Sequence, residues 1–146
     1  MRPAYRARQI LNYVNGSTLL GLLAGRLGRS TFTRGPDGLI LAHNYRFAIP
    51  PQRNPAFTIG NVVLIRMDFN EFIDAQTLLR HEARHSTQYT YCFGLPMLPL
   101  YLLASGWSYI CTGDPASRNF FERQAGLADG GYTERPLRWA RTAARS

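Results

Sequence analysis

Apolar residues recur at helical spacing in two stretches near the amino terminus. In the second stretch Ser17 is placed to cap a helix, and the apolar face consists of Leu19, Leu20, Leu23 and Leu27. We therefore predict helices over Tyr5–Tyr13 and Ser17–Leu27. A turn is expected in Thr31–Gly38, because this segment contains the sequence Gly-Pro-Asp-Gly.

The pattern then changes to the two-residue period that is typical of strands. Apolar and polar residues alternate from Leu39 to Ile49, and Pro50-Pro51 end the run. Ala56–Arg66 predicts a second strand, in which the continuous apolar run Val62–Ile65 indicates burial on both faces of a sheet. Together the two strands predict a small antiparallel sheet.

Helical spacing returns in the second half of the chain. Asp74 is placed to cap a helix that reaches about Tyr91, with Gly94 just past its end. Another helix is expected from Asp114-Pro115 to about Ala128. Strands followed by helices indicate the α+β class. The chain has 146 residues, of which 45% are hydrophobic, and we expect one domain with a complete core.

The stretch between Ser86 and Gly113 contains no charged residue. It is long enough to cross a bilayer, but it is interrupted by Gly94, Pro96, Pro99 and Gly106. We therefore expect a buried or interfacial segment and not a membrane span. The two cysteines, Cys92 and Cys111, leave a disulfide and two buried thiols both open, and we favour the thiols.

The formal net charge of +8 is concentrated at the two ends of the chain. All 17 basic residues are Arg. The N-terminal helical region, 1–35, has six Arg and no acidic residue, whereas the C-terminal tail, 132–146, has four Arg and one Glu. The segment between them has a charge of −1. An anionic partner, either nucleic acid or a membrane surface, would therefore meet the ends of the chain.

The sequence His81-Glu82-Ala83-Arg84-His85 has the H-E-x-x-H arrangement. Histidines four residues apart lie on one face of a helix, so their imidazoles can bind one metal ion together. Such a site suits Zn²⁺. Glu82 would lie beside the open position of the ion, where a carboxylate can act as general base for a water molecule.

A third ligand is needed to complete such a site. Glu122 is the favoured candidate, because Ala125 and Gly126 on the same predicted helix face would allow close approach to the metal helix. A salt bridge to an Arg is the alternative role for Glu122. His43 is the second candidate, although a histidine on an apolar strand face is more often part of a core. Asp129 is a more distant third candidate.

These motifs resemble the gluzincin branch of zincin metallopeptidases, and they are similar to small bacterial zincin-like proteins. The resemblance spans 57–132. The matching segments are Phe57–Gly60, His81–Tyr89, Gly94, Pro99–Tyr101 and Asn119–Ala125. It implies zinc at His81, His85 and Glu122, with Glu82 as general base and a sheet packed against the active-site helix.

The sequence departs from the thermolysin-like members near the third ligand. Phe121 and Gly126 stand where those members have an Asn and an Asp that orient the histidines. The orienting groups are therefore missing or supplied by other residues. The candidates for a transition-state donor or an orienting group are Tyr89, Tyr101, Tyr132 and Asn119.

The sequence therefore supports two functional hypotheses. The first is a zinc-dependent hydrolase, a minimal metallopeptidase that acts on a peptide or protein. The second is a non-catalytic module whose Arg-rich ends bind nucleic acid or an anionic membrane. The segment before Arg26 lacks the pattern of a cleaved signal peptide. We expect a cytoplasmic protein, with membrane association left open.

Overall fold

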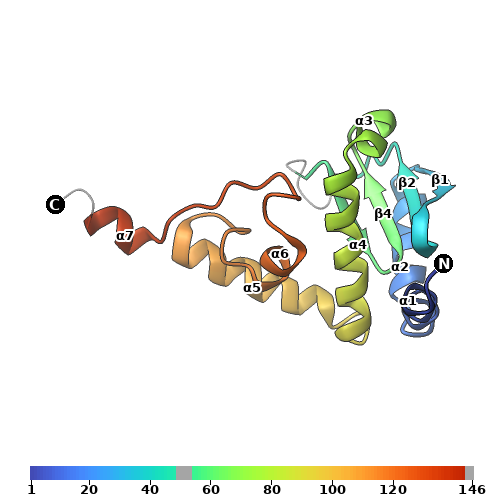
Figure 1. Cartoon of the computed structure of the whole chain (residues 1–146), viewed down its shortest axis with the longest axis horizontal. Helices are drawn as coiled ribbons and strands as arrows, with labels where there is room; N and C mark the ends of the chain where they lie inside the picture. Colours follow the sequence, from blue (N-terminus) through green and yellow to red (C-terminus); the bar gives the residue numbers. More distant parts are fainter. Residues whose placement is uncertain (49–53, 144–146) are drawn as a thin grey trace.

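The computed structural model describes residues 1–48 and 54–143, and Figure 1 shows their arrangement. The helices are α1 (Pro3–Val14), α2 (Ser17–Leu27), α3 (Phe69–Asp74), α4 (Gln76–Tyr91), α5 (Met97–Thr112), α6 (Phe120–Ala125), α7 (Arg138–Ala143) and the 3₁₀ turn η1 (Pro36–Gly38). The strands are β1 (Thr31–Arg34), β2 (Ile40–His43), β3 (Ala56–Ile59) and β4 (Val62–Ile65). The α+β class is confirmed, and α2 has the predicted bounds. Ser17 is its first residue and does not cap it, because the cap position is Gly16.

The four strands form one mixed sheet in the order β1-β2-β4-β3. β1 pairs antiparallel with β2, and β3 pairs antiparallel with β4, but β2 and β4 are parallel. The prediction of an antiparallel sheet is therefore wrong in its central pair. The cause is a tight turn at Gly60, with φ of +62°, which divides the predicted single strand Ala56–Arg66 into a hairpin.

The other predicted strand is shorter than its sequence pattern indicates. β2 ends at His43, and Asn44 has the left-handed φ of +61°, which bends the chain out of the sheet. Ile49 and Pro50-Pro51 lie outside the described residues. The turn expected in Thr31–Gly38 is also corrected, because its first half forms β1 and only its second half is a 3₁₀ turn.

Two predicted helix starts are corrected by the observed caps. Asp74 is the last residue of α3 and does not cap α4, whereas Asp68 caps α3 by accepting the Glu71 N–H at 3.1 Å. No helix begins at Pro115, because residues 115–118 form a turn in which Asp114 accepts the Ser117 N–H at 3.0 Å. α6 begins later, at Phe120, and ends at Ala125. Gly94 follows α4 as predicted, with φ of +90°.

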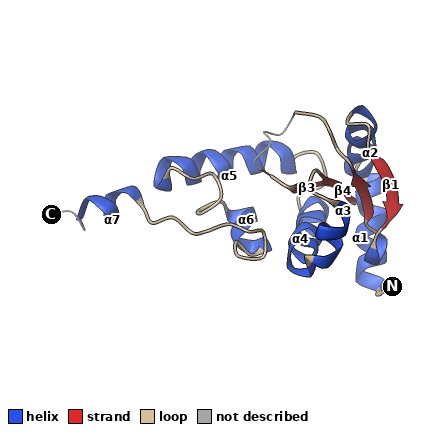
Figure 2. Cartoon of the chain, turned by 90° about the horizontal axis from the view of Figure 1, so that it is seen from above, coloured by secondary structure: helices blue, strands red, loops and turns tan. Residues whose placement is uncertain are grey.

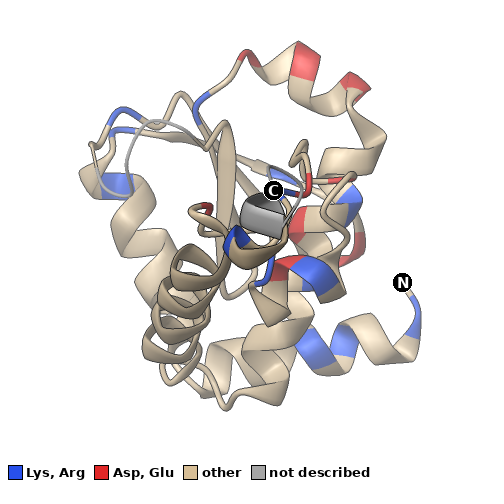
Figure 3. Ribbon diagram, turned by 90° about the vertical axis from the view of Figure 1, so that its left-hand side faces the viewer, with Lys and Arg blue, Asp and Glu red and all other residues tan. Residues whose placement is uncertain are grey.

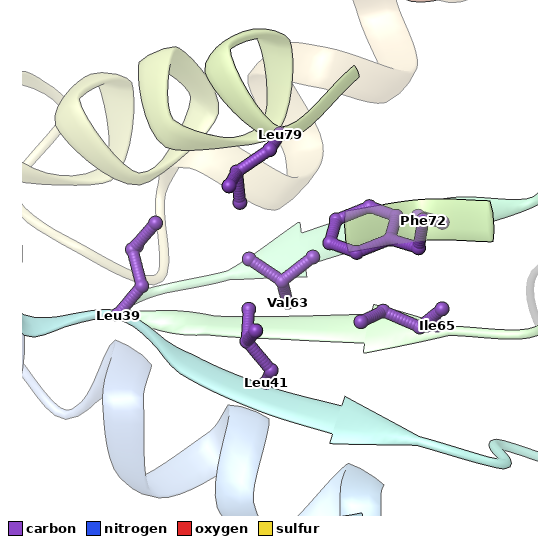
Figure 4. Close-up of a cluster of buried hydrophobic side chains, with 7 residues drawn as sticks. Leu39, Leu41, Val63, Ile65, Phe72 and Leu79 are labelled. Carbon is purple, nitrogen blue, oxygen red and sulfur yellow. The ribbon is translucent and has the colours of Figure 1, made fainter. Parts of the chain in front are cut away.

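The sheet is covered by helices on both faces. Figure 4 shows the side of the core that faces α3 and α4, where Val63 and Ile65 contact Phe72 and Leu79. The opposite face buries Val62 and Leu64 against α2. The continuous apolar run of β4 is therefore buried on both faces, as predicted. On the far side of α4, α6 packs against this helix, whereas α5 and α7 extend away from the sheet (Figure 1).

A buried polar network fixes α4 relative to the rest of the fold. The Asn61 amide donates to the Gln9 carbonyl at 2.9 Å and to the Thr18 hydroxyl at 2.8 Å. The Asn12 amide donates to the Asn61 side-chain oxygen at 3.1 Å and to the Ser86 carbonyl at 2.9 Å. Because buried polar groups are costly when unpaired, this network fixes the register of α1 and α2 against α4.

The predicted thiols are present in the structure. Cys92 is half-buried and Cys111 is buried, and both are free. None of the helices in 1–48 and 54–143 combines the length and the apolar character that a membrane crossing requires.

Gly21 provides a test of the close packing of α2 on the sheet. A Cβ at this position would lie 2.4 Å from the Ile59 carbonyl oxygen and 2.8 Å from the Val62 Cβ. We expect Gly21→Ala to lower the free energy of unfolding by about 1–3 kcal/mol, because backbone atoms must shift. Gly106→Ala is the matched control, since open space surrounds this position in α5, and it should raise the value by about 0.5–1 kcal/mol. Urea denaturation measures both, and equal effects would contradict the packing.

Candidate metal centre

His81, His85 and Glu122 come together in the interior of the protein. The two histidines lie one turn apart on α4, and Glu122 reaches them from α6. The two Nε2 atoms are 3.0 Å apart, and Glu122 Oε2 lies 3.0 Å from His81 Nε2 and 3.5 Å from His85 Nε2. Each of the three residues is at most 7% exposed. They form a group that could hold a metal ion.

Hydrogen bonds on the far side of each ring determine which nitrogen faces the centre. His81 Nδ1 lies 2.9 Å from the Gly126 carbonyl, which can only accept. His85 Nδ1 lies 2.8 Å from the Gln88 side-chain oxygen. The Gln88 amide nitrogen donates to the Phe121 carbonyl at 2.9 Å, so this oxygen is fixed toward the ring. Both Nδ1 atoms are therefore donors, and both neutral imidazoles present Nε2 as an acceptor.

When both imidazoles are neutral, this arrangement places three acceptor atoms against one another. Glu122 Oε2 is buried and has no hydrogen-bond donor. Two nitrogen lone pairs and a carboxylate oxygen repel one another unless a cation lies between them. A tetrahedral zinc ion with bonds of about 2.0–2.1 Å has ligand atoms about 3.3 Å apart. The observed separations of 3.0–3.5 Å fit an ion of this size.

The same need for positive charge is evident in the pKa values. Burial alone would raise the pKa of Glu122, but its contacts with His81 and His85 hold the pKa well below its usual range. Burial would lower the pKa of His85, but the Glu122 carboxylate outweighs this and raises it to about 9. Without a metal, a proton on His85 therefore supplies part of the compensating charge.

Glu82 lies beside this group but is held by a different element. Its Oε2 accepts the hydroxyl of Thr58, in β3, at 2.6 Å. Burial raises the pKa of Glu82, and this effect exceeds the opposing influence of His85. Glu82 and the three grouped residues line one cavity of about 400 Å³.

Three of the four candidates for a transition-state donor or an orienting group also line the cavity. They are Tyr89, Tyr101 and Tyr132. The Tyr101 hydroxyl donates to Glu122 Oε1, which orients this carboxylate. The Tyr132 ring lies 6.0 Å from the His81 ring. Burial is the main cause of the raised pKa of all three phenols, which therefore remain protonated at neutral pH.

Asn119 and the alternative third ligands have other roles. The Asn119 side-chain oxygen accepts the Phe121 N–H at 3.0 Å, so this residue caps α6 and does not line the cavity. His43 stacks on Phe69 with ring centroids 4.3 Å apart. Asp129 pairs with Arg84 at 3.0 Å. Neither His43 nor Asp129 belongs to the metal-binding group.

The groups that orient the histidines were not assigned from the sequence. Gln88 is three residues after His85, which is the spacing of neighbours on a helix face, and this signal could have identified it. The Gly126 carbonyl had no such signal, because a backbone group has no residue type. Gly130 also contacts His81, since a Cβ there would lie 2.6 Å from the imidazole.

Comparison of the chain with protein-family models, curated proteins and solved structures gives no match.

If the three grouped residues bind one metal ion, replacing any one of them should lower the metal content of the protein. Protein purified with zinc should contain one equivalent of metal, and His81→Ala, His85→Ala and Glu122→Ala should each lower this content severely, because each removes one of three ligands. His43→Ala is the matched control, because the third histidine of the chain lies outside the group. Elemental analysis measures the metal. Full retention of metal in Glu122→Ala would move the third ligand elsewhere.

Gln88 should influence metal affinity without touching the ion. Gln88→Met removes the acceptor of the His85 Nδ1 proton, and we expect zinc affinity to fall about 10–100-fold. Gln88→Glu keeps an oxygen at this position and should recover most of the affinity. Competition with a chromophoric chelator measures both variants. Unchanged affinity in Gln88→Met would show that the hydrogen bond does not orient His85.

Proposed function

We propose that the protein is a zinc-dependent hydrolase that cleaves peptide bonds. One observation carries this proposal: the two imidazoles, the Glu122 carboxylate and the separate Glu82 carboxylate line the same cavity. Two nitrogens and one oxygen are a donor set that zinc accepts in catalytic sites, where a further position stays open. Zinc bound there would supply Lewis acidity, lowering the pKa of a water molecule towards about 7 and polarising a carbonyl group.

Glu82 has the position and the protonation behaviour of the general base. It is adjacent in sequence to a ligand, but its carboxylate is held by Thr58 and not by the metal group. Burial raises its pKa, so this carboxylate accepts a proton from the attacking water more readily than an exposed one. It would then deliver that proton to the leaving amine.

The tyrosines have different roles in this proposal. Tyr101 is committed to Glu122 and serves to orient this ligand. The Tyr132 hydroxyl makes no hydrogen bond to any residue in the described part of the chain, and its ring faces His81 in the cavity. We assign Tyr132 as the donor that stabilises the negative charge developing on the substrate carbonyl oxygen.

The sheet supports a peptide as the substrate. β3 is an edge strand, and four of its residues line the cavity together with Glu82. An extended chain could pair with this edge and pass the metal group. The resemblance to gluzincins agrees with this arrangement. The structure also supplies orienting groups in place of the missing Asn and Asp, namely the Gly126 carbonyl and the Gln88 side chain.

Glu82→Gln separates catalysis from metal binding. The zinc-loaded variant should keep its metal but lose peptide hydrolysis by about 10²–10⁴-fold, because the amide cannot accept the proton. The assay is mass spectrometry of a peptide mixture with varied apolar residues, incubated with the purified protein. Glu71→Gln is the control, since this side chain is exposed and is not among the residues that line the cavity. Cleavage that persists in Glu82→Gln would contradict the assigned role.

A further inference from the structure

The cavity of the metal centre opens between two apolar helices. Leu27 of α2, Phe47 and Leu102 of α5 line the cavity and are 62%, 45% and 69% exposed. Exposed residues that also line a cavity mark its mouth, so this mouth is apolar. Figure 2 shows α2 and α5 on the same, upper side of the molecule, with α1 and α4 below.

Apolar side chains continue outward from the mouth along both helices. On α2, Leu19 and Leu23 are exposed. On α5, the exposed apolar residues are Leu100, Leu102, Leu103, Trp107, Tyr109 and Ile110. We call this surface, formed by α2, α5 and residues 44–48, the apolar face. Exposed apolar side chains gathered around the mouth of a cavity are typical of binding sites for proteins or membranes.

Basic residues stand at the edge of the apolar face. Arg29 and Arg46 are exposed and line a hollow together with Leu27 and Phe47 of the mouth. Arg138, at the other end of the face, donates to the Tyr109 carbonyl at 3.1 Å. No acidic residue occurs in 1–36 or 86–113, which contain both helices. In Figure 3 most acidic residues lie on the right-hand side and at the top.

We propose that the apolar face binds the surface of an anionic lipid bilayer. The apolar side chains of α2 and α5 would enter the boundary between headgroups and acyl chains, while Arg29 and Arg46 contact the phosphates. Trp107 and Tyr109 are residue types that favour this boundary. A second copy of this chain fits the charges less well, because a symmetric contact would bring two basic edges together.

This orientation has a consequence for the substrate, which rests on the proposed hydrolase function. The mouth would face the lipid headgroups, so the chains that reach the metal group would be peptide segments held at the membrane surface. Apolar side chains on such peptide segments would match the apolar lining of the cavity mouth. Binding to lipid does not itself require hydrolysis, so the two proposals can fail separately.

Vesicle flotation with the full-length, zinc-loaded protein tests the proposal. The protein should float with vesicles of phosphatidylcholine and phosphatidylglycerol, with a blue shift of tryptophan fluorescence, and bind vesicles of phosphatidylcholine alone much more weakly. Higher salt should weaken the binding, because it screens the Arg–phosphate attraction. Glu82→Gln should bind as the wild type does, which keeps this result independent of catalysis.

Two pairs of variants locate the binding surface. Leu103→Ser with Trp107→Ser should lower vesicle binding about tenfold or more, whereas Ile10→Ser with Val14→Ser, equally exposed on α1, should not. Arg29→Gln with Arg46→Gln should lower it about 30-fold, since each basic residue at an anionic surface contributes about a fivefold factor. The charge control is Arg6→Gln with Arg34→Gln. Retained zinc and near-ultraviolet circular dichroism verify folding.

Three outcomes would overturn the proposal. The first is no flotation with anionic vesicles at any salt concentration. The second is binding that the control pairs reduce as much as the test pairs, which would indicate attraction by net charge alone. The third is a concentration-dependent dimer that Leu103→Ser with Trp107→Ser dissociates, without vesicle binding, which would assign the apolar face to a second copy.

Discussion

The structure depends on one electrostatic constraint, the meeting of two imidazole acceptor atoms and a carboxylate oxygen away from water. Each of the groups around them strengthens the constraint. The Gly126 carbonyl and the Gln88 oxygen hold the ring protons on the outer side, and Tyr101 holds one oxygen of Glu122 so that the other points inward. Removing these groups would let the rings turn and the repulsion relax. With these groups in place, the three side chains could hold a cation between them.

The three grouped residues are carried by two helices that are held in different ways. α4 is fixed to the sheet by the apolar core and to α1 by the buried Asn61 network, so the histidines have a rigid base. α6 is only six residues long and is positioned by Asn119 at its start and by contacts to Gln88 and Arg84. Glu122 is therefore carried by a short element whose position depends on α4.

Features with a local signature were predictable from the sequence. The four-residue spacing of the histidines predicted that both rings face one point from a single helix, and the small residues beside Glu122 predicted its approach to them. The continuous run in β4 correctly indicated burial on both faces. The hairpin at Gly60 and the parallel pairing of β2 with β4 were missed, because they depend on a glycine turn that packs against Ser17 and Thr18 and not on the strand pattern. Asp74 and Asp114 have the residue type of a helix cap, but α4 begins after Ala75 and α6 begins after Asn119.

The separation between the histidines and Glu122 along the chain has a consequence for folding. The group joins His85 to a residue 37 positions later, across α5 and the turn that follows it. A bound ion would close this long loop much as a disulfide does, in a protein whose two cysteines are free. Because a site of this kind does not exist in the unfolded chain, the free energy of metal binding becomes free energy of folding. The metal would therefore act as the cross-link that joins α6, and the C-terminal part of the chain that follows it, to α4.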